Sequence, residues 1–466
     1  MLATAWSLDR GRDWVVVTPE GFFDGSSRAM GTIMKWRVDT VAPLEVDSGK
    51  VQAGVPPQAP VDVNLLPLEH YFSDFYHPGI LSDVIRQARP LREILRSRGD
   101  PRADLRLADR DRRLPTVRIE APRTTASRST EVVIRVSRGA RDLRLYRNGV
   151  LAARWAGAIT KPLVTARITA VAGDNVLTAY AFNADNVKSV DAVARMGGDR
   201  SLARAPQAHV LCIGINAYRD ATHALKFAVA DATDTADALR GSLPFAPDAI
   251  QVRTLLDAGA TREGILKALE ALAVESQPED TVVILYSGHG VLEGGRFVLI
   301  PQDMGRISDA DLERLLLPVQ ARHVALILDA CHSGQALASD DWRRGPLNAR
   351  GLVQLAWEKG MDLLAASQSA QTAQETWQIG DRPIGHGLLT FALIEEGLKA
   401  GQAPRRGNTL WARDWMQYAV GRVPGLLGGT DLRGRDLKVT GNERQSGQIP
   451  VLFHRREPDT DWPVHK

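Results

Sequence analysis

The amino-acid sequence predicts an α/β protein with a mostly parallel sheet covered by helices on both faces. An all-β sandwich and a small N-terminal segment are expected to precede it. Apolar strand-like runs alternate with helical patterns over some 250 residues from residue 206 onward, which is typical of a parallel sheet. Residues 115–198 instead hold short runs of alternating polarity separated by turn residues, as a β-sandwich does. At 466 residues the chain is too long for one ordinary core, so two or three domains are expected.

The bulk composition is that of a soluble globular protein, with 44% hydrophobic and 24% charged residues. No apolar run reaches 18 residues, so no membrane-spanning helix or membrane partner is expected. The N-terminus lacks the basic start and apolar core of a secretory signal. Only two cysteines occur, which argues against a disulfide framework and favours a reducing compartment. We therefore expect a cytoplasmic protein, and the Ala- and Arg-rich composition indicates a bacterial source.

A basic stretch over residues 81–147 contrasts with a net acidic remainder, since it holds eighteen arginines against nine acidic residues. Such a stretch could meet nucleic acid or an acidic partner. Its arginines alternate with acids, however, and no aromatic platform for stacking on bases accompanies them. Solvated helix and strand faces explain the pattern better, so no nucleic-acid partner is expected.

The N-terminal segment, residues 1–110, predicts short strands and helix without indicating a fold. The run DWVVVTPEGFFDGS predicts two strands around a Pro-Glu-Gly turn. Residues 49–60 are typical of a linker, and residues 75–99 predict helix that breaks near Pro90.

Residues 113–198 predict an immunoglobulin-like sandwich built from five or more short strands. Asn148-Gly149 predicts a tight hairpin, because both residues tolerate the positive φ that such turns require. The Cys…Trp…Cys pattern of true immunoglobulin domains is missing, so the likeness is one of architecture. Modules of this kind serve as spacers or bind a protein partner, and both roles are open here.

A linker at 196–207 leads into the third region, residues 206–455, where strands and helices alternate. The expected strands are 209–218, 250–256, 281–287, 296–301, 323–331 and 361–368. The expected helices are 226–241, 261–275, 309–318, 385–401 and 408–423, and Thr261 is expected to cap the second of them.

Two of these strands end in residues that can perform nucleophilic chemistry. VVILYSGHG (282–290) delivers His289 between two glycines, and HVALILDACHSG (323–334) delivers Cys331. Ligands of parallel sheets bind at the carboxyl edge of the strands. A lone histidine at such a place most often satisfies a backbone group, and a lone cysteine is as often structural. The pair at matching strand ends favours a thiolate nucleophile with a proton shuttle, whereas Cys212 within VLCIGI is expected to be buried and inert.

These motifs resemble those of the caspase-like cysteine peptidases, nearest their metacaspase and bacterial branches. The resemblance covers about residues 207–400 and implies a caspase-like fold for residues 206–455. The motifs that carry it, in the family's order, are IGINAY (213–218), YSGHG (286–290), LDACHSG (328–334), ASQSAQTAQET (366–376) and GHGLLTFALIEEG (385–397).

The resemblance implies an endopeptidase with His289 and Cys331 as its catalytic dyad. The N–H groups of Gly290 and Cys331 would form the oxyanion hole.

The resemblance also implies a specificity pocket lined by Asp231, Ser287 and Asp329. Asp329 stands where caspases carry glutamine, and two carboxylates would repel an acidic side chain and pair with a basic one. Cleavage of a protein or peptide substrate after Arg or Lys is therefore expected. Asp231 has a second explanation, as a helix N-terminal acid stabilised by the helix dipole.

No cofactor is expected to be required, although the resemblance allows calcium. Asp303 and Asp309 lie at places comparable to calcium-binding acids of some metacaspases. Ala310 stands where a further acid is often found, so the set is incomplete. Hard cations need several oxygen ligands, and two solvated aspartates explain the pattern as well.

The stretch 338–351 occupies the segment that some relatives cleave during activation. Arg343, Arg344 and Arg350 would suit an arginine-specific enzyme that processes itself, and a plain surface loop explains them equally well.

Two alternatives to this function stay open. One is a catalytically silent caspase-fold scaffold that acts through the sandwich, and the other is an active peptidase with non-basic specificity. The silent scaffold is disfavoured because a binding module needs none of the dyad, the oxyanion glycine and the acidic pocket together.

Overall fold

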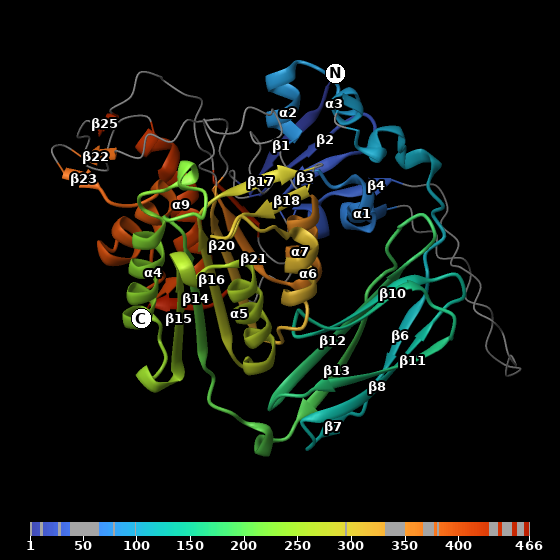
Figure 1. Cartoon of the computed structure of the whole chain (residues 1–466). Coiled ribbons are helices and arrows are strands. Elements are labelled where there is room, and N and C mark those ends of the chain that lie inside the picture. The colour runs from blue at the N-terminus through green and yellow to red at the C-terminus, as the bar shows by residue number, and fades with distance from the viewer. Residues whose placement is uncertain are drawn as a thin grey trace, which may run out of the picture. The chain divides into compact units, whose positions relative to one another are not determined.

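A computed structural model describes most of the chain (Figure 1). The chain divides into two compact units, Met1–Arg204 and Ala205–Lys466, and each is described by itself. The described residues are 2–9, 13–26, 29–37, 65–77, 80–97, 99–293, 296–330, 350–366, 377–379, 382–427, 437–439, 450–453 and 461–465.

The first unit begins with a three-stranded antiparallel sheet of β1 (Thr4–Leu8), β2 (Asp13–Val17) and β3 (Phe23–Gly25). The predicted turn between β2 and β3 is present, with the Gly21 N–H donating to the Thr18 carbonyl at 3.0 Å. Helices α2 (Ile80–Gln87) and α3 (Leu91–Ser97) flank Pro90, as predicted. The other elements of this segment are η2 (Ala29–Ile33), β4 (Lys35–Arg37), β5 (Leu65–Pro67), η3 (Leu68–Tyr71), α1 (Phe72–Phe75), η4 (Pro101–Asp104) and η5 (Leu107–Asp109).

Residues 117–198 form a β-sandwich whose two sheets share one core. Ile134 of the smaller sheet and Leu145 and Leu177 of the larger sheet all belong to that core. Asn148 and Gly149, with φ of 49° and 77°, form the predicted two-residue hairpin turn. The assignment to the immunoglobulin-like class remains a prediction. The larger sheet has the order β10 (Val150–Ala158), β9 (Arg141–Arg147), β12 (Gly173–Phe182), β13 (Ala192–Gly198), β7 (Thr124–Thr125). The smaller sheet has the order β11 (Leu163–Thr169), β8 (Ser129–Val136), β6 (Val117–Glu120).

A buried lysine ties the N-terminal segment to the sandwich within this unit. Lys188 Nζ lies 3.3 Å from Glu69 Oε1 and 2.6 Å from Asp191 Oδ1. His70 Nδ1 lies 2.7 Å from the Lys188 carbonyl oxygen. Burial, followed by the charge of Lys188, lowers the pKa of His70 to about 4. The ring is therefore neutral near pH 7, and its Nδ1–H donates to that carbonyl.

The second unit is built on a six-stranded sheet that confirms the predicted α/β architecture. The first five strands in spatial order are parallel, and the sixth, at the edge, is antiparallel. β14 and β16 are buried along their whole length, which explains why their sequences are continuously apolar. The order is β15 (Ile250–Leu256), β14 (Ala208–Gly214), β16 (Thr281–Ser287), β20 (His323–Asp329), β21 (Asp362–Ala365), β26 (Val451–Phe453).

Helices cover both faces of this sheet (Figure 1). One face packs on α4, η12 and α9 through residues such as Cys212, Leu285 and Trp415, and the other face lies toward α5, α6 and α7. Thr261 Oγ1 accepts a hydrogen bond from the Gly264 N–H at 3.1 Å, which confirms the predicted cap. The bounds are α4 (Ala228–Ser242), α5 (Arg262–Glu275), α6 (Asp309–Leu316), α7 (Arg350–Lys359), α8 (Leu388–Thr390), η12 (Phe391–Lys399, a π-helix) and α9 (Ala412–Leu427).

Short antiparallel strands complete the second unit. Directly after His289 the chain forms a small sheet, of which only the second strand was predicted; its members are β17 (Gly290–Glu293), β18 (Arg296–Leu299) and β19 (Ile307–Ser308). The remaining strands are β22 (Trp377–Ile379), β23 (Arg382–Ile384), β24 (Leu410–Trp411), β25 (Leu437–Val439) and β27 (Pro463–His465). The short helical turns of this unit are η7 (Ala221–His223), η8 (Pro247–Ala249) and η9 (Asp257–Gly259), and the first unit contains η6 (Arg200–Leu202). None of the helices within the described ranges is long and apolar enough to cross a membrane.

Candidate functional site

The carboxyl ends of three neighbouring strands bring the candidate site together. The register places Gly214, Ser287 and Asp329 side by side at the ends of β14, β16 and β20. Helix α4 packs directly on Gly214, because a Cβ there would lie 2.3 Å from the Ala228 carbonyl oxygen. This close approach brings the first turn of α4, which carries Asp231, over the end of β16.

Asp231 is buried and its carboxylate has three neighbours from distant parts of the chain. Oδ2 accepts a hydrogen bond from Ser287 Oγ at 2.8 Å. Oδ1 accepts one from the Gly387 N–H at 3.0 Å and lies 3.1 Å from His386 Nδ1. Asp231 therefore lies in the first turn of its helix and also belongs to the cluster at the strand ends.

Asp329 is the second buried carboxylate of this cluster. Its Oδ2 accepts hydrogen bonds from Thr390 Oγ1 at 2.9 Å and from the Thr390 N–H at 3.2 Å, in helix α8. A Cβ on Gly387 would lie 2.7 Å from Asp329 Oδ2 and 3.2 Å from Asp231 Oδ2. The two acids and Ser287, which the resemblance grouped in one pocket, therefore lie together around Gly387. Two buried carboxylates at one point favour a cationic ligand.

The glycines around His289 allow the chain to approach its neighbours closely. A Cβ on Gly288 would lie 2.8 Å from Tyr218 Oη. A Cβ on Gly290 would lie 2.8 Å from the Phe297 ring and 3.2 Å from the Ala330 Cβ. Because any larger residue would force these groups apart, the loop can hold His289 at the end of β16 only with glycine on each side.

The hydrogen bonds of His289 determine which ring nitrogen carries the proton. Nε2 lies 2.8 Å from the His223 carbonyl oxygen. A carbonyl oxygen can only accept, so Nε2 carries the hydrogen and the neutral ring has its lone pair at Nδ1. Tyr218 stacks obliquely on the ring, with centroids 4.7 Å apart, and its hydroxyl accepts the His289 backbone N–H at 2.7 Å. The imidazole is therefore fixed in position with Nδ1 as its basic atom.

Two buried tyrosines form hydrogen bonds with the backbone of His289. Tyr286 Oη lies 2.9 Å from the His289 carbonyl oxygen and 2.7 Å from that of Ile300. Burial raises the pKa of Tyr286 and of Tyr218, so both hydroxyls stay protonated and can act as hydrogen-bond donors.

Several predicted site residues lie outside the described part of the chain, namely Cys331, Arg343 and Arg344. Arg350 is the first residue of α7. Ala330, the residue before Cys331, is buried against Gly290.

The second cysteine is an inert thiol, as predicted. Cys212 is buried in β14, and burial raises its pKa to about 12. The thiol is therefore protonated at neutral pH and does not act as a nucleophile.

The two aspartates considered for calcium bind backbone groups. Asp303 Oδ1 accepts from the Arg262 N–H at 3.1 Å, and Asp309 Oδ1 accepts from the Ala310 N–H at 2.9 Å. Neither belongs to the one group of three or more metal-ligand side chains that the described residues contain.

His386 was missed by the sequence reasoning, although the motif GHGLLTFALIEEG contains it. Its Nδ1 lies 3.1 Å from Asp231 Oδ1 and its Nε2 lies 3.1 Å from Asp234 Oδ2. Burial alone would lower the pKa of His386. The hydrogen bond to Asp231 and the charges of Asp231, Asp234 and Glu395 outweigh it, so the pKa is raised. A local signal was available, because His386 lies between two glycines as His289 does. The spacing could not identify its partners, which lie far away in the sequence.

Comparisons with known proteins find similarity between part of this chain and the caspases and metacaspases. Residues 207–408 match the family model described as the caspase domain. The chain is 27% identical to metacaspase-3 of Arabidopsis thaliana over 231 residues, which are 43% of this chain and 62% of the relative. It is 36% identical to metacaspase-1 of Meyerozyma guilliermondii over 92 residues, 16% of this chain and 22% of the relative. The match thus spans less than two thirds of either relative. The solved structure of the Drosophila initiator caspase Dronc is similar with a TM-score of 0.33 and 9% identity, over 54% of this chain and 81% of that one.

Proposed function

From the caspase domain that residues 207–408 form, we propose that this chain is a cysteine endopeptidase with Cys331 as nucleophile and His289 as base. The observation that carries the proposal is the position of the lone pair in the neutral ring of His289. With Nε2 donating to the His223 carbonyl, Nδ1 is the atom that can take the proton of a thiol. The burial of Ala330 against Gly290 supports pairing His289 with the residue that follows Ala330.

The proposed reaction begins when Nδ1 of His289 takes the proton of the Cys331 thiol. The thiolate attacks the carbonyl carbon of the scissile peptide, and the N–H groups of Gly290 and Cys331 stabilise the resulting oxyanion. The protonated imidazole then gives its proton to the leaving amine, and water hydrolyses the thioester through the same base. The products are two peptides and the free thiol.

We propose that the preferred side chain before the scissile bond is Arg or Lys. The support is the pair of buried carboxylates, Asp231 and Asp329, that converge on Gly387 together with Ser287. An acidic side chain would meet two like charges there, whereas a guanidinium or ammonium group would form charge-assisted hydrogen bonds.

The proposal also covers how the peptidase is regulated and where in the cell it acts. The enzyme would process itself after Arg343, Arg344 or Arg350, and its sandwich would bind a protein partner. A reducing, cytoplasmic location would keep the Cys331 thiol free, and the two-cysteine composition supports it.

The test is steady-state cleavage of peptide reporters that end in Arg, Lys or Asp before the fluorophore. Reactions with and without calcium also test the role considered for Asp303 and Asp309. The expected result is cleavage after Arg and Lys that falls at least about 10³-fold in the Cys331→Ala variant. Intact-mass measurement of the same samples detects self-processing. Absence of cleavage under every condition would instead support the silent scaffold.

A further inference from the structure

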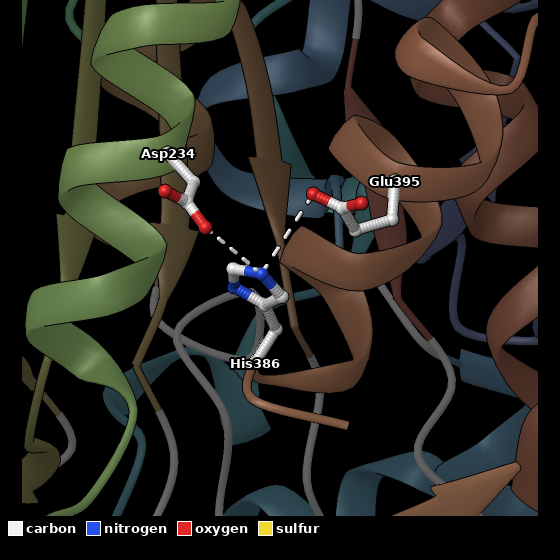
Figure 2. A group of neighbouring side chains, drawn as sticks. All are labelled: Asp234, His386 and Glu395. Carbon is white, nitrogen blue, oxygen red and sulfur yellow. Dashed lines mark ion pairs between the residues drawn. The ribbon is translucent and has the colours of Figure 1, made fainter. Parts of the chain in front are cut away.

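Three side chains that can bind a metal come together from three separate elements (Figure 2). Asp234 lies on α4, Glu395 on η12, and His386 in the segment before α8. Their candidate ligand atoms all lie within 4.8 Å of one another. We propose that Asp234, His386 and Glu395 form a binding site for a divalent cation of the zinc class. The reaction described above does not require such an ion.

The distances between these atoms fit a single tetrahedral ion. His386 Nε2 lies 3.1 Å from Asp234 Oδ2 and 3.8 Å from Glu395 Oε1. Two ligands bound tetrahedrally at about 2.1 Å lie about 3.4 Å apart, between those two values. The third pair of ligand atoms, on Asp234 and Glu395, lies within 4.8 Å, so a small movement of the two carboxylates toward each other would complete the site.

The imidazole is held in the orientation that metal ligation needs. Its other nitrogen, Nδ1, lies 3.1 Å from the buried carboxylate of Asp231, and histidine ligands characteristically donate this N–H to a carboxylate. Asp231 and Asp234 lie three residues apart on α4, so one face of the helix presents both acids to the two ring nitrogens. This arrangement directs Nε2 toward Asp234 and Glu395.

The donor set selects the kind of ion. One imidazole nitrogen and two carboxylate oxygens, with water in the fourth position, suit zinc and related transition metals. Calcium would need six to eight oxygen ligands. The ion replaces the proton on Nε2, which passes to solvent, and it competes with Lys399, whose Nζ lies 2.6 Å from Glu395 Oε1. Binding would link α4 to η12.

The test is a zinc titration of the full chain against a chromophoric chelator. The Cys331→Ala background removes the thiol that could bind zinc at the dyad, so the result does not depend on peptidase activity. Asp234→Asn and Glu395→Gln each remove one ligand with little change in shape. Asp237→Asn is the matched control, because Asp237 lies one turn further along α4, exposed and paired with Arg240.

The proposal predicts one zinc site that weakens at least about tenfold in each ligand variant and is unchanged in the control. Cobalt should give the absorption bands of a tetrahedral ion in the control variant and not in the other two. The melting temperature of the control should rise with zinc concentration more than that of the ligand variants. Equal zinc affinity in all three variants, or no zinc binding by the control, would overturn the proposal.

Discussion

Gly387→Ala tests the acidic pocket with a single methyl group. Gly387 is the N-cap of α8 with φ −60° and ψ 148°, a conformation that alanine adopts without strain. The new Cβ would lie 2.7 Å from Asp329 Oδ2 and 3.2 Å from Asp231 Oδ2, so at least one carboxylate must move. The substitution therefore acts on the pocket rather than on the backbone.

The expected effects on activity and stability differ in size. Displacing one carboxylate removes a charge-assisted hydrogen bond of about 3 kcal/mol to the substrate cation, which lowers kcat/KM for Arg reporters roughly 100-fold. Crowding costs about 1–3 kcal/mol of folding free energy, and the loss of glycine flexibility in the unfolded chain returns about 0.4–1 kcal/mol. The variant should stay folded and lose most of its activity.

The assay measures kcat/KM with an Arg reporter and the free energy of unfolding in urea. Gly385→Ala is the matched control, because Gly385 is exposed and its added Cβ meets nothing within 4 Å. Equal kcat/KM in the two variants would refute the placement of the substrate cation between Asp231 and Asp329.

Two further predictions follow from the shifted pKa values. Because the pKa of Cys212 is about 12, iodoacetamide at pH 8 should label it in Cys331→Ala only after unfolding, and rapid labelling of the native variant by mass spectrometry would contradict this. The pKa of His70 is about 4 in the folded chain, against an ordinary 6.5. Above pH 6.5 the ring is neutral in both the folded and the unfolded chain, so this pKa shift does not change the free energy of unfolding there. As the pH falls from 6.5 to 4 the unfolded chain binds a proton that the folded chain does not, which removes about 3 kcal/mol of stability. Between pH 7 and pH 4, the free energy of unfolding in urea should fall less for His70→Asn, whose amide can still donate to the Lys188 carbonyl, than for the unmodified chain. An identical fall in the two chains would contradict the lowered pKa of His70.

The sequence was sufficient for the sheet because its strands are covered on both faces. Full burial requires continuously apolar runs such as TVVILYS, and caps such as Thr261 mark where helices begin. The hairpin at Asn148-Gly149 was predictable for an equally local reason, since few other residues adopt positive φ twice in succession.

The detail of the site was not predictable from local patterns. His386 and Asp231 are 155 residues apart in the sequence, and Thr390 and Asp329 are 61 apart. Tyr218 supports His289 across 71 residues. His223 contributes a backbone carbonyl oxygen, which any residue could supply, and the edge-to-face contact of its ring with His289. These contacts depend on how helices lie on the sheet, which periodicity and spacing do not specify.

The most direct test of the account compares two reporters of nearly the same shape, of which only one carries a positive charge. Citrulline matches arginine in length and planar shape, but it is neutral and carries a carbonyl oxygen where arginine has an NH2 group. The ratio of kcat/KM for Arg and citrulline reporters therefore measures the preference of the pocket for the charged, donor-only guanidinium. The account predicts a ratio of roughly 100 or more, from about 3 kcal/mol of charge-assisted binding, and a much smaller ratio in Asp329→Asn. Equal kcat/KM for the two reporters in the unmodified enzyme would contradict the account.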